Sequence, residues 1–69
     1  MKTIVKVDGM MCSMCEAHIN DVIRKNFNII KVKSNRKKKE TIIESNEQLD
    51  KNKIKEVIDQ TGYTVLGFE

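Results

Sequence analysis

The side chains best suited to chemistry in this 69-residue sequence are its two cysteines, Cys12 and Cys15. When two thiols three residues apart lie on a loop that enters a helix, both sulfur atoms can reach one ion without a change of fold. Thiolates are soft donors that suit Cu(I) and, less selectively, Zn(II), Cd(II) or Hg(II). A helix N-terminus also lowers the pKa of a thiol and stabilises its anionic form. The pair therefore predicts a soft-metal site that captures its ion near neutral pH.

The cysteine spacing alone does not identify the chemistry, because C-x-x-C also occurs in redox motifs and zinc knuckles. A dithiol oxidoreductase of the thioredoxin type is longer and relies on a proline, and this sequence has none. A structural zinc site needs four ligands, more than two cysteines and one histidine provide. A sparsely coordinated metal site is the stronger hypothesis, and a redox dithiol or a disulfide pair is the weaker one.

The elements that flank the cysteines follow from the spacing of apolar residues. Alternation over Lys2–Asp8 predicts a strand with one buried face. After Cys15 the apolar residues recur at helical intervals, Ser13 is a candidate N-cap, and Glu16 suits the positive end of the helix dipole. We therefore expect a helix to about Asn26, with the cysteines at a strand-to-helix junction.

The rest of the chain predicts a hairpin, a second helix and a last strand. Two β-branched stretches, Ile30–Val32 and Thr41–Ile43, flank a polar segment and are typical of a hairpin. Asp50 is a candidate cap for a second helix, and Gly62 stands where a helix C-terminus favours a left-handed residue. Tyr63–Phe68 is the predicted last strand.

The order β-α-β-β-α-β, without a linker or a repeat, predicts one α+β domain over residues 1–69. Two helices of this length need a sheet to bury their apolar stripes, and the ferredoxin-like sandwich is the natural packing. It has a four-stranded antiparallel sheet with two helices on one face. The alternating directions bring the cysteine loop, the hairpin tip and the Gly62-Tyr63 turn to one end of the domain.

The net charge of +3 is unevenly distributed along the chain. Residues 24–39 hold eight basic groups and no acidic one, and the segments on either side are net acidic. This block includes Lys37, Lys38 and Lys39 at the predicted hairpin tip. The tip is either a docking surface for an acidic partner or a solvated turn that protects a sheet edge.

Several classes of function are disfavoured by length and composition. A nucleic-acid module of this topology would place stacking aromatics on its central strands, but the one Tyr and two Phe lie outside them. No apolar stretch reaches membrane-spanning length, and nothing at Met1 resembles a signal peptide. A chain this short also cannot enclose a large active-site cavity. We expect a cytoplasmic binding protein, not an enzyme, without nucleic acid or direct membrane insertion.

The segment around the cysteines, Gly9-Met10-Met11-Cys12-Ser13-Met14-Cys15, resembles the metal loop of the heavy-metal-associated domain. The resemblance covers essentially the whole chain. That family includes copper chaperones, the N-terminal metal-binding domains of copper- and zinc-transporting P-type ATPases, and periplasmic mercury-binding proteins. The resemblance implies Cu(I) held by Cys12 and Cys15 in a Met-x-Cys-x-x-Cys loop, with Zn(II), Cd(II) or Hg(II) as alternative ions.

The resemblance also implies roles for residues near the loop. Met10 is expected to be buried and to support the loop, and Tyr63 follows Gly62 as in the Gly-Tyr pair of bacterial copper chaperones, where the ring packs near the metal loop. Zinc- and cadmium-preferring members often carry an acidic residue where this chain has Met11, which favours Cu(I). His18 departs from the family pattern, and it is either an additional ligand one turn past Cys15 or a solvated surface residue.

The implied partner is a copper-transporting P-type ATPase or another thiolate metal acceptor. Its cysteines would displace Cys12 and Cys15 one at a time through a three-coordinate intermediate. A free-standing copper chaperone and a domain excised from such an ATPase would look almost the same in sequence. We expect a monomer, and a metal-bridged dimer through paired loops stays open.

Overall fold

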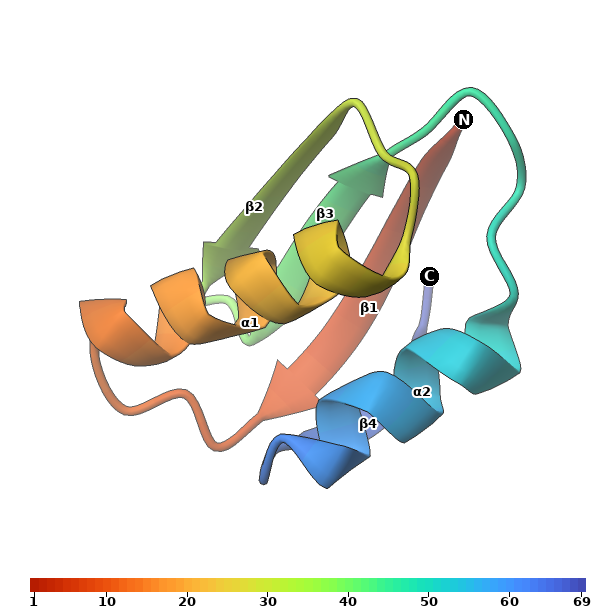
Figure 1. Ribbon diagram of the computed structural model, residues 1–69. Coiled ribbons are helices and arrows are strands. Elements are labelled where there is room, and N and C mark those ends of the chain that lie inside the picture. Colours follow the sequence, from red (N-terminus) through yellow and green to blue (C-terminus); the bar gives the residue numbers. More distant parts are fainter.

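A computed structural model of the chain confirms the predicted order of elements and the α+β class (Figure 1). The strands are β1 (Lys2–Asp8), β2 (Lys31–Asn35), β3 (Glu40–Glu44) and β4 (Thr64–Phe68), and the helices are α1 (Ser13–Asn26) and α2 (Lys51–Gln60). The sheet has the order β2-β3-β1-β4, and all neighbouring strands are antiparallel. Both helices cover the same face of the sheet (Figure 1), as expected for a ferredoxin-like sandwich.

The hydrophobic core lies between the two helices and the sheet. Alternate residues of each strand point inward, so Val5 of β1 and Ile43 of β3 are fully buried. Each helix contributes isoleucines four residues apart, which lie on the same face of a helix. The buried apolar residues are Val5, Val7, Met10, Ile19, Ile23, Val32, Ile43, Ile54 and Ile58.

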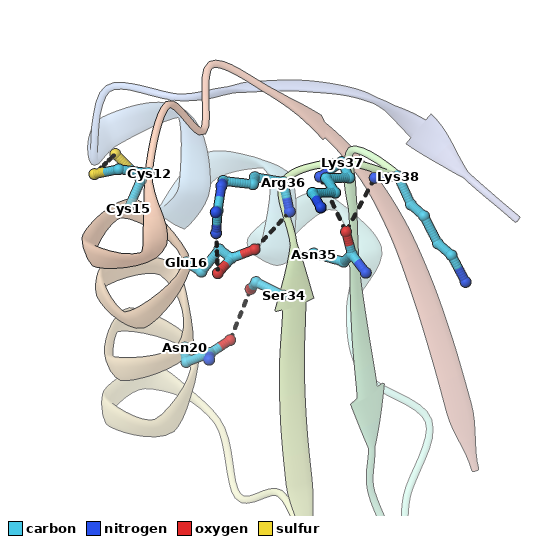
Figure 2. A network of polar contacts seen from close by, with 9 residues as sticks. All are labelled: Cys12, Cys15, Glu16, Asn20, Ser34, Asn35, Arg36, Lys37 and Lys38. Carbon is cyan, nitrogen blue, oxygen red and sulfur yellow. Dashed lines mark hydrogen bonds and ion pairs between the residues drawn. The ribbon is translucent and has the colours of Figure 1, made fainter.

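A short chain of polar side chains crosses the core from α1 to the hairpin of β2 and β3. The Ser34 hydroxyl donates to Asn20 Oδ1 at 2.7 Å and lies 2.9 Å from Thr41 Oγ1. Buried hydroxyls are costly unless they are hydrogen-bonded, and these two satisfy each other. Because Asn20 of α1 and Ser34 of β2 point toward each other (Figure 2), their hydrogen bond fixes where α1 lies along β2.

The predicted cap of α1 is wrong by one residue. Ser13 is already helical, and Cys12 is the N-cap, with an extended backbone and no side-chain cap hydrogen bond. The Cys12 carbonyl accepts hydrogen bonds from the backbone N–H groups of Cys15 and Glu16 at 3.1 and 3.3 Å. These two bonds begin the helix at the first cysteine, one residue earlier than the position of Ser13 suggested.

The second half of the chain follows the prediction closely, with small shifts at the strand ends. Asp50 caps α2 by accepting hydrogen bonds from the N–H groups of Asn52 and Lys53. Ile30 lies just outside β2 and is 64% exposed, and Tyr63 lies in the turn before β4. Neither helix has the length and apolar character needed to cross a membrane.

Two neighbouring isoleucines of β3 give a matched test of the core. Ile43→Val is expected to lower the free energy of unfolding by about 1 kcal/mol, because Ile43 is fully buried and the missing methyl leaves a void. Ile42→Val, on the open face of the same strand, is expected to change it by less than about 0.5 kcal/mol. Urea denaturation of both variants measures the difference, and equal effects would contradict this assignment of the two faces.

Candidate metal centre

The two cysteines lie at the junction of β1 and α1, and their sulfur atoms are 3.8 Å apart (Figure 2). Cys12 ends the loop that follows β1, and Cys15 lies in the first turn of α1. Both thiols are free; Cys12 is exposed and Cys15 is half-buried. The loop therefore presents two soft donors that are close enough to share one ion and open to an incoming partner.

The environment of Cys15 favours its thiolate form. The Tyr63 hydroxyl, acting as a hydrogen-bond donor, is the largest cause that lowers the pKa of Cys15 to about 7, and hydrogen bonds with the backbone of Met11 and Cys12 add to it. The same contact with Cys15 is the largest cause that raises the pKa of Tyr63 to about 12. Tyr63 therefore stays protonated near neutral pH and keeps its proton available to the sulfur.

Tyr63 lies against the start of the loop as well as against Cys15. Gly9 has a φ of 102°, a conformation that favours glycine, and a Cβ built there would lie 3.5 Å from Tyr63 Cδ1. The backbone of the loop thus passes close to the tyrosine ring. This packing explains how a residue in the turn before β4 reaches the cysteine loop.

The methionines of the loop divide into one buried and two exposed residues. Met10 is 9% exposed and belongs to the core cluster, where it holds the loop against the domain. Met11 and Met14 are 85% and 78% exposed. Their thioethers are open to solvent, on either side of Cys12 in the sequence.

His18 lies beside Tyr63, not between the thiols. Its exposed ring meets the tyrosine ring edge-on, with centroids 6.1 Å apart and an interplanar angle of 82°. No group of three His, Cys, Asp or Glu side chains comes together anywhere in the chain. The two soft donors that the fold brings together are therefore Cys12 and Cys15. His18, which the sequence offered either as an additional ligand or as a solvated surface residue, is exposed beside Tyr63.

The hairpin tip lies at the same end of the domain as the cysteine loop, as the strand directions predicted. The Lys39 carbonyl accepts from the Val7 N–H at 2.9 Å. The backbone N–H groups of Lys37 and Lys38 donate to Asn35 Oδ1 at 2.9 and 3.1 Å, which shapes the turn (Figure 2). All three lysine side chains are exposed, so the tip adds positive charge beside the metal loop.

A contact that sequence reasoning missed joins the tip to α1. Glu16, the residue after Cys15, accepts from the Arg36 backbone N–H at 2.7 Å and from Arg36 Nη1 at 3.2 Å (Figure 2). The sequence assigned Glu16 a local role at the positive end of the helix dipole and gave no reason to expect a second, long-range contact. The signal in the sequence is an acidic residue in the first helical turn and a basic tip expected at the same end of the domain.

The pKa of Cys15 gives a pH-dependent prediction. Tyr63→Phe removes the donor to the thiolate, so deprotonation becomes harder and the pKa of Cys15 rises from about 7 towards its ordinary value of 9.0. Iodoacetamide labelling against pH, with each cysteine resolved by peptide mass spectrometry, measures this midpoint. Phe68→Leu, distant from the loop in sequence and at the end of β4, is the control and leaves the midpoint in place.

The same shift has a consequence for folding. Because the pKa of Cys15 is lower in the folded chain, its thiolate favours the folded state fully above about pH 9, the ordinary thiol value. That contribution falls as the pH drops through 7.

A Tyr63→Phe labelling midpoint equal to that of the wild type would contradict the role of the hydroxyl.

Comparisons with known proteins agree with this fold. The family model described as the heavy-metal-associated domain matches residues 4–64. The CopZ metallochaperone has a TM-score of 0.87 and 18% identity, over 96% of this chain and 100% of that one. The yeast copper transporter domain CCC2A, solved in apo and Cu(I)-loaded states, has a TM-score of 0.86 and 25% identity, over 99% and 93% of the two chains.

A third structure extends the comparison to zinc. The N-terminal domain of ZntA in its Zn(II) form has a TM-score of 0.83 and 15% identity, over 96% of this chain and 89% of that one. The search among curated proteins finds no match. The family match spans most of the chain and includes both cysteines. This chain belongs to the heavy-metal-associated domain family, whose members bind and carry heavy-metal ions.

Proposed function

We propose that this protein binds Cu(I) through the thiolates of Cys12 and Cys15 and passes it to a partner by ligand exchange. The observation that carries the proposal is the pair of free sulfur atoms 3.8 Å apart at the start of α1. Cys12 is exposed, so an incoming thiolate can reach a bound ion. The function is binding and transfer, and it requires no catalytic residue.

The sulfur spacing suits an exchange that passes through three ligands. A metal–sulfur distance of about 2.3 Å places two thiolates about 4.6 Å apart across a linear ion and about 4.0 Å apart at a trigonal one. The observed separation of 3.8 Å is closer to the trigonal value than to the linear one, and it also matches the value of about 3.8 Å at a tetrahedral ion. A third thiolate from the partner therefore joins with little movement of the pair, and a linear ion requires the loop to open slightly.

The donor set favours Cu(I) over the other soft ions. Zn(II) usually takes four protein ligands or three and a water, and here only two thiols come together. Met11 is the residue at the position that is often acidic in zinc- and cadmium-preferring members, and its exposed thioether carries no charge. Zn(II), Cd(II) and Hg(II) accept thiolates too, so they are the competing ions in the test below.

The proposed partner is a copper-transporting P-type ATPase or another thiolate metal acceptor. The copper-binding domain of the P-type ATPase HMA7 has this fold, with a TM-score of 0.82 and 21% identity. A second candidate function follows from that likeness, because the single domain proposed for residues 1–69 can serve as a chaperone or as the metal-binding domain of such an ATPase. We place the chaperone first, as a cytoplasmic monomer, with a metal-bridged dimer as the alternative state.

Docking of the partner is assigned to Lys37, Lys38 and Lys39. Their side chains are exposed at the end of the domain that carries the thiols. Charge complementarity raises the rate of encounter and fixes orientation more than it raises affinity. An acidic partner surface would therefore be guided to approach with its own cysteines near Cys12.

A competitive titration tests the metal assignment. Reduced protein is titrated with Cu(I) against a chromophoric chelator, and the titration is repeated with Zn(II). The Cys12→Ser, Cys15→Ser double variant is expected to lose Cu(I) affinity by orders of magnitude, because both donors are gone. Ser13→Ala, between the two cysteines, is the control and keeps the affinity. Circular dichroism checks that both variants fold.

Each outcome of this titration supports or excludes one class of function. Tight Cu(I) binding that depends on the cysteines supports the carrier. Tighter binding of Zn(II) than of Cu(I) would overturn the metal, and binding that ignores the cysteines would overturn the site. In that case the midpoint potential of the Cys12–Cys15 pair tests the weaker hypothesis of a redox dithiol.

The basic tip gives a prediction about rate. Replacing the three lysines of residues 37–39 by serine is expected to slow Cu(I) transfer to an acidic partner domain at low salt and to spare the Cu(I) affinity. The effect should shrink at about 1 M salt, where the screening length falls to about 3 Å. Stopped-flow absorbance measures the rate. The matched control replaces Lys2, Lys31 and Lys33, on the open sheet face, and an equal slowing there would contradict docking at the tip.

A further inference from the structure

The hairpin tip, residues 36–39, contacts the chain on both sides of the metal loop. Before the loop, the Lys39 carbonyl accepts from the Val7 N–H at 2.9 Å, and Lys39 Nζ lies 3.5 Å from Asp8 Oδ1. After the loop, Arg36 binds the Glu16 carboxylate (Figure 2). One four-residue turn thus fixes the two ends between which both thiols lie.

The contact with Glu16 is the closer of the two. Both carboxylate oxygens are engaged, at 2.7 Å by the Arg36 backbone and at 3.2 Å by its guanidinium, and the Glu16 side chain is only 20% exposed. Glu16 follows Cys15 directly, and its own N–H donates to the Cys12 carbonyl at 3.3 Å. A shift of Glu16 therefore moves the turn that sets the separation of the two sulfurs.

We propose that Glu16 and Arg36 are positioning residues for the metal loop, and that an acidic partner that docks on the tip breaks the contact between them. The inference rests on the proposed transfer function and adds a link between docking and release. A carboxylate on the partner competes with Glu16 for Arg36. When this contact is exchanged, the end of the loop at Cys15 loosens, and the bound ion becomes easier to pass on.

The exposure of the groups makes this competition feasible. The Arg36 side chain is 40% exposed, so a partner can reach its guanidinium from solvent. Ion pairs of this kind are weak, because water screens them, and they exchange partners readily. Lys37 and Lys38 form no ion pair within the chain and attract the acidic surface first, without disturbing the loop.

The positioning role is tested first without metal. Glu16→Gln keeps an oxygen that can accept from the Arg36 backbone but removes the charge. Amide hydrogen exchange at Cys15 and Glu16 is expected to become roughly two- to fivefold faster, the factor that corresponds to an exposed ion pair. Glu56→Gln, the same change on the outer face of α2, is the control and leaves these amides unaffected. Unchanged exchange in Glu16→Gln would overturn the role.

A double variant distinguishes a positioning role of the two residues from a general loss of stability. If Glu16 acts through Arg36, the double variant Glu16→Gln, Arg36→Gln exchanges no faster at the loop than either single variant. Additive acceleration would show that each residue acts alone and would contradict the proposal. Exchange at core amides such as Ile43 stays constant throughout, which confirms that the domain remains folded.

The link to docking is tested with a hexaglutamate peptide and the Cu(I)-loaded protein. The peptide is expected to speed Cu(I) loss to a chromophoric chelator for the wild type and for Glu56→Gln, and to have a smaller effect on Glu16→Gln, whose loop is already loose. A peptide that binds the tip, seen as NMR shifts at Lys37 and Lys38, without any change in rate would overturn the release step. Failure of the Cu(I) titration would instead reject the proposed function and leave the metal-free exchange result intact.

Discussion

The feature on which the whole site depends is where α1 begins. The Cys12 carbonyl accepts the first hydrogen bonds of the helix, from the N–H groups of Cys15 and Glu16. This makes Cys12 the last extended residue and Cys15 the third helical one, and it sets their sulfurs 3.8 Å apart. A helix that began one residue later, with Ser13 as its cap, would leave the Cys12 carbonyl without these bonds and remove that constraint. The chemistry of the site is therefore a consequence of one turn of backbone.

The rest of the domain supplies supports for that turn from different directions. Met10 packs into the core below the loop, and the Tyr63 ring lies against Gly9 while its hydroxyl lowers the pKa of Cys15. The polar contact from Asn20 to Ser34 fixes α1 along β2. Each support comes from a separate element of the sandwich. A chain of this length can hold a reactive loop because neither cysteine belongs to its buried core, although Cys15 packs against that core.

The sequence allowed the fold and the thiol pair to be predicted, because both depend on local pattern. Strand alternation, helical spacing and the cap at Asp50 are encoded within a few residues of each element, and the antiparallel directions then brought the loop and the tip together. The pairs Glu16 with Arg36 and His18 with Tyr63 were not predicted. They join residues far apart in the chain. Each depends on a side-chain rotamer and on the position of α1 along the sheet, and the spacing of residues in the sequence predicts neither.

The two thiols differ in ways that matter for an ion that must be both held and released. Cys12 is exposed and ends a loop, whereas Cys15 is half-buried, lies in a helix and has a lowered pKa. A thiol with a pKa of about 7 offers a thiolate to a soft ion near neutral pH far more readily than an ordinary cysteine does. An exposed one gives an incoming ligand room to attack. Since the first turn of α1 and the Tyr63 hydroxyl beside it produce both environments, one site combines retention of the ion with access for a partner.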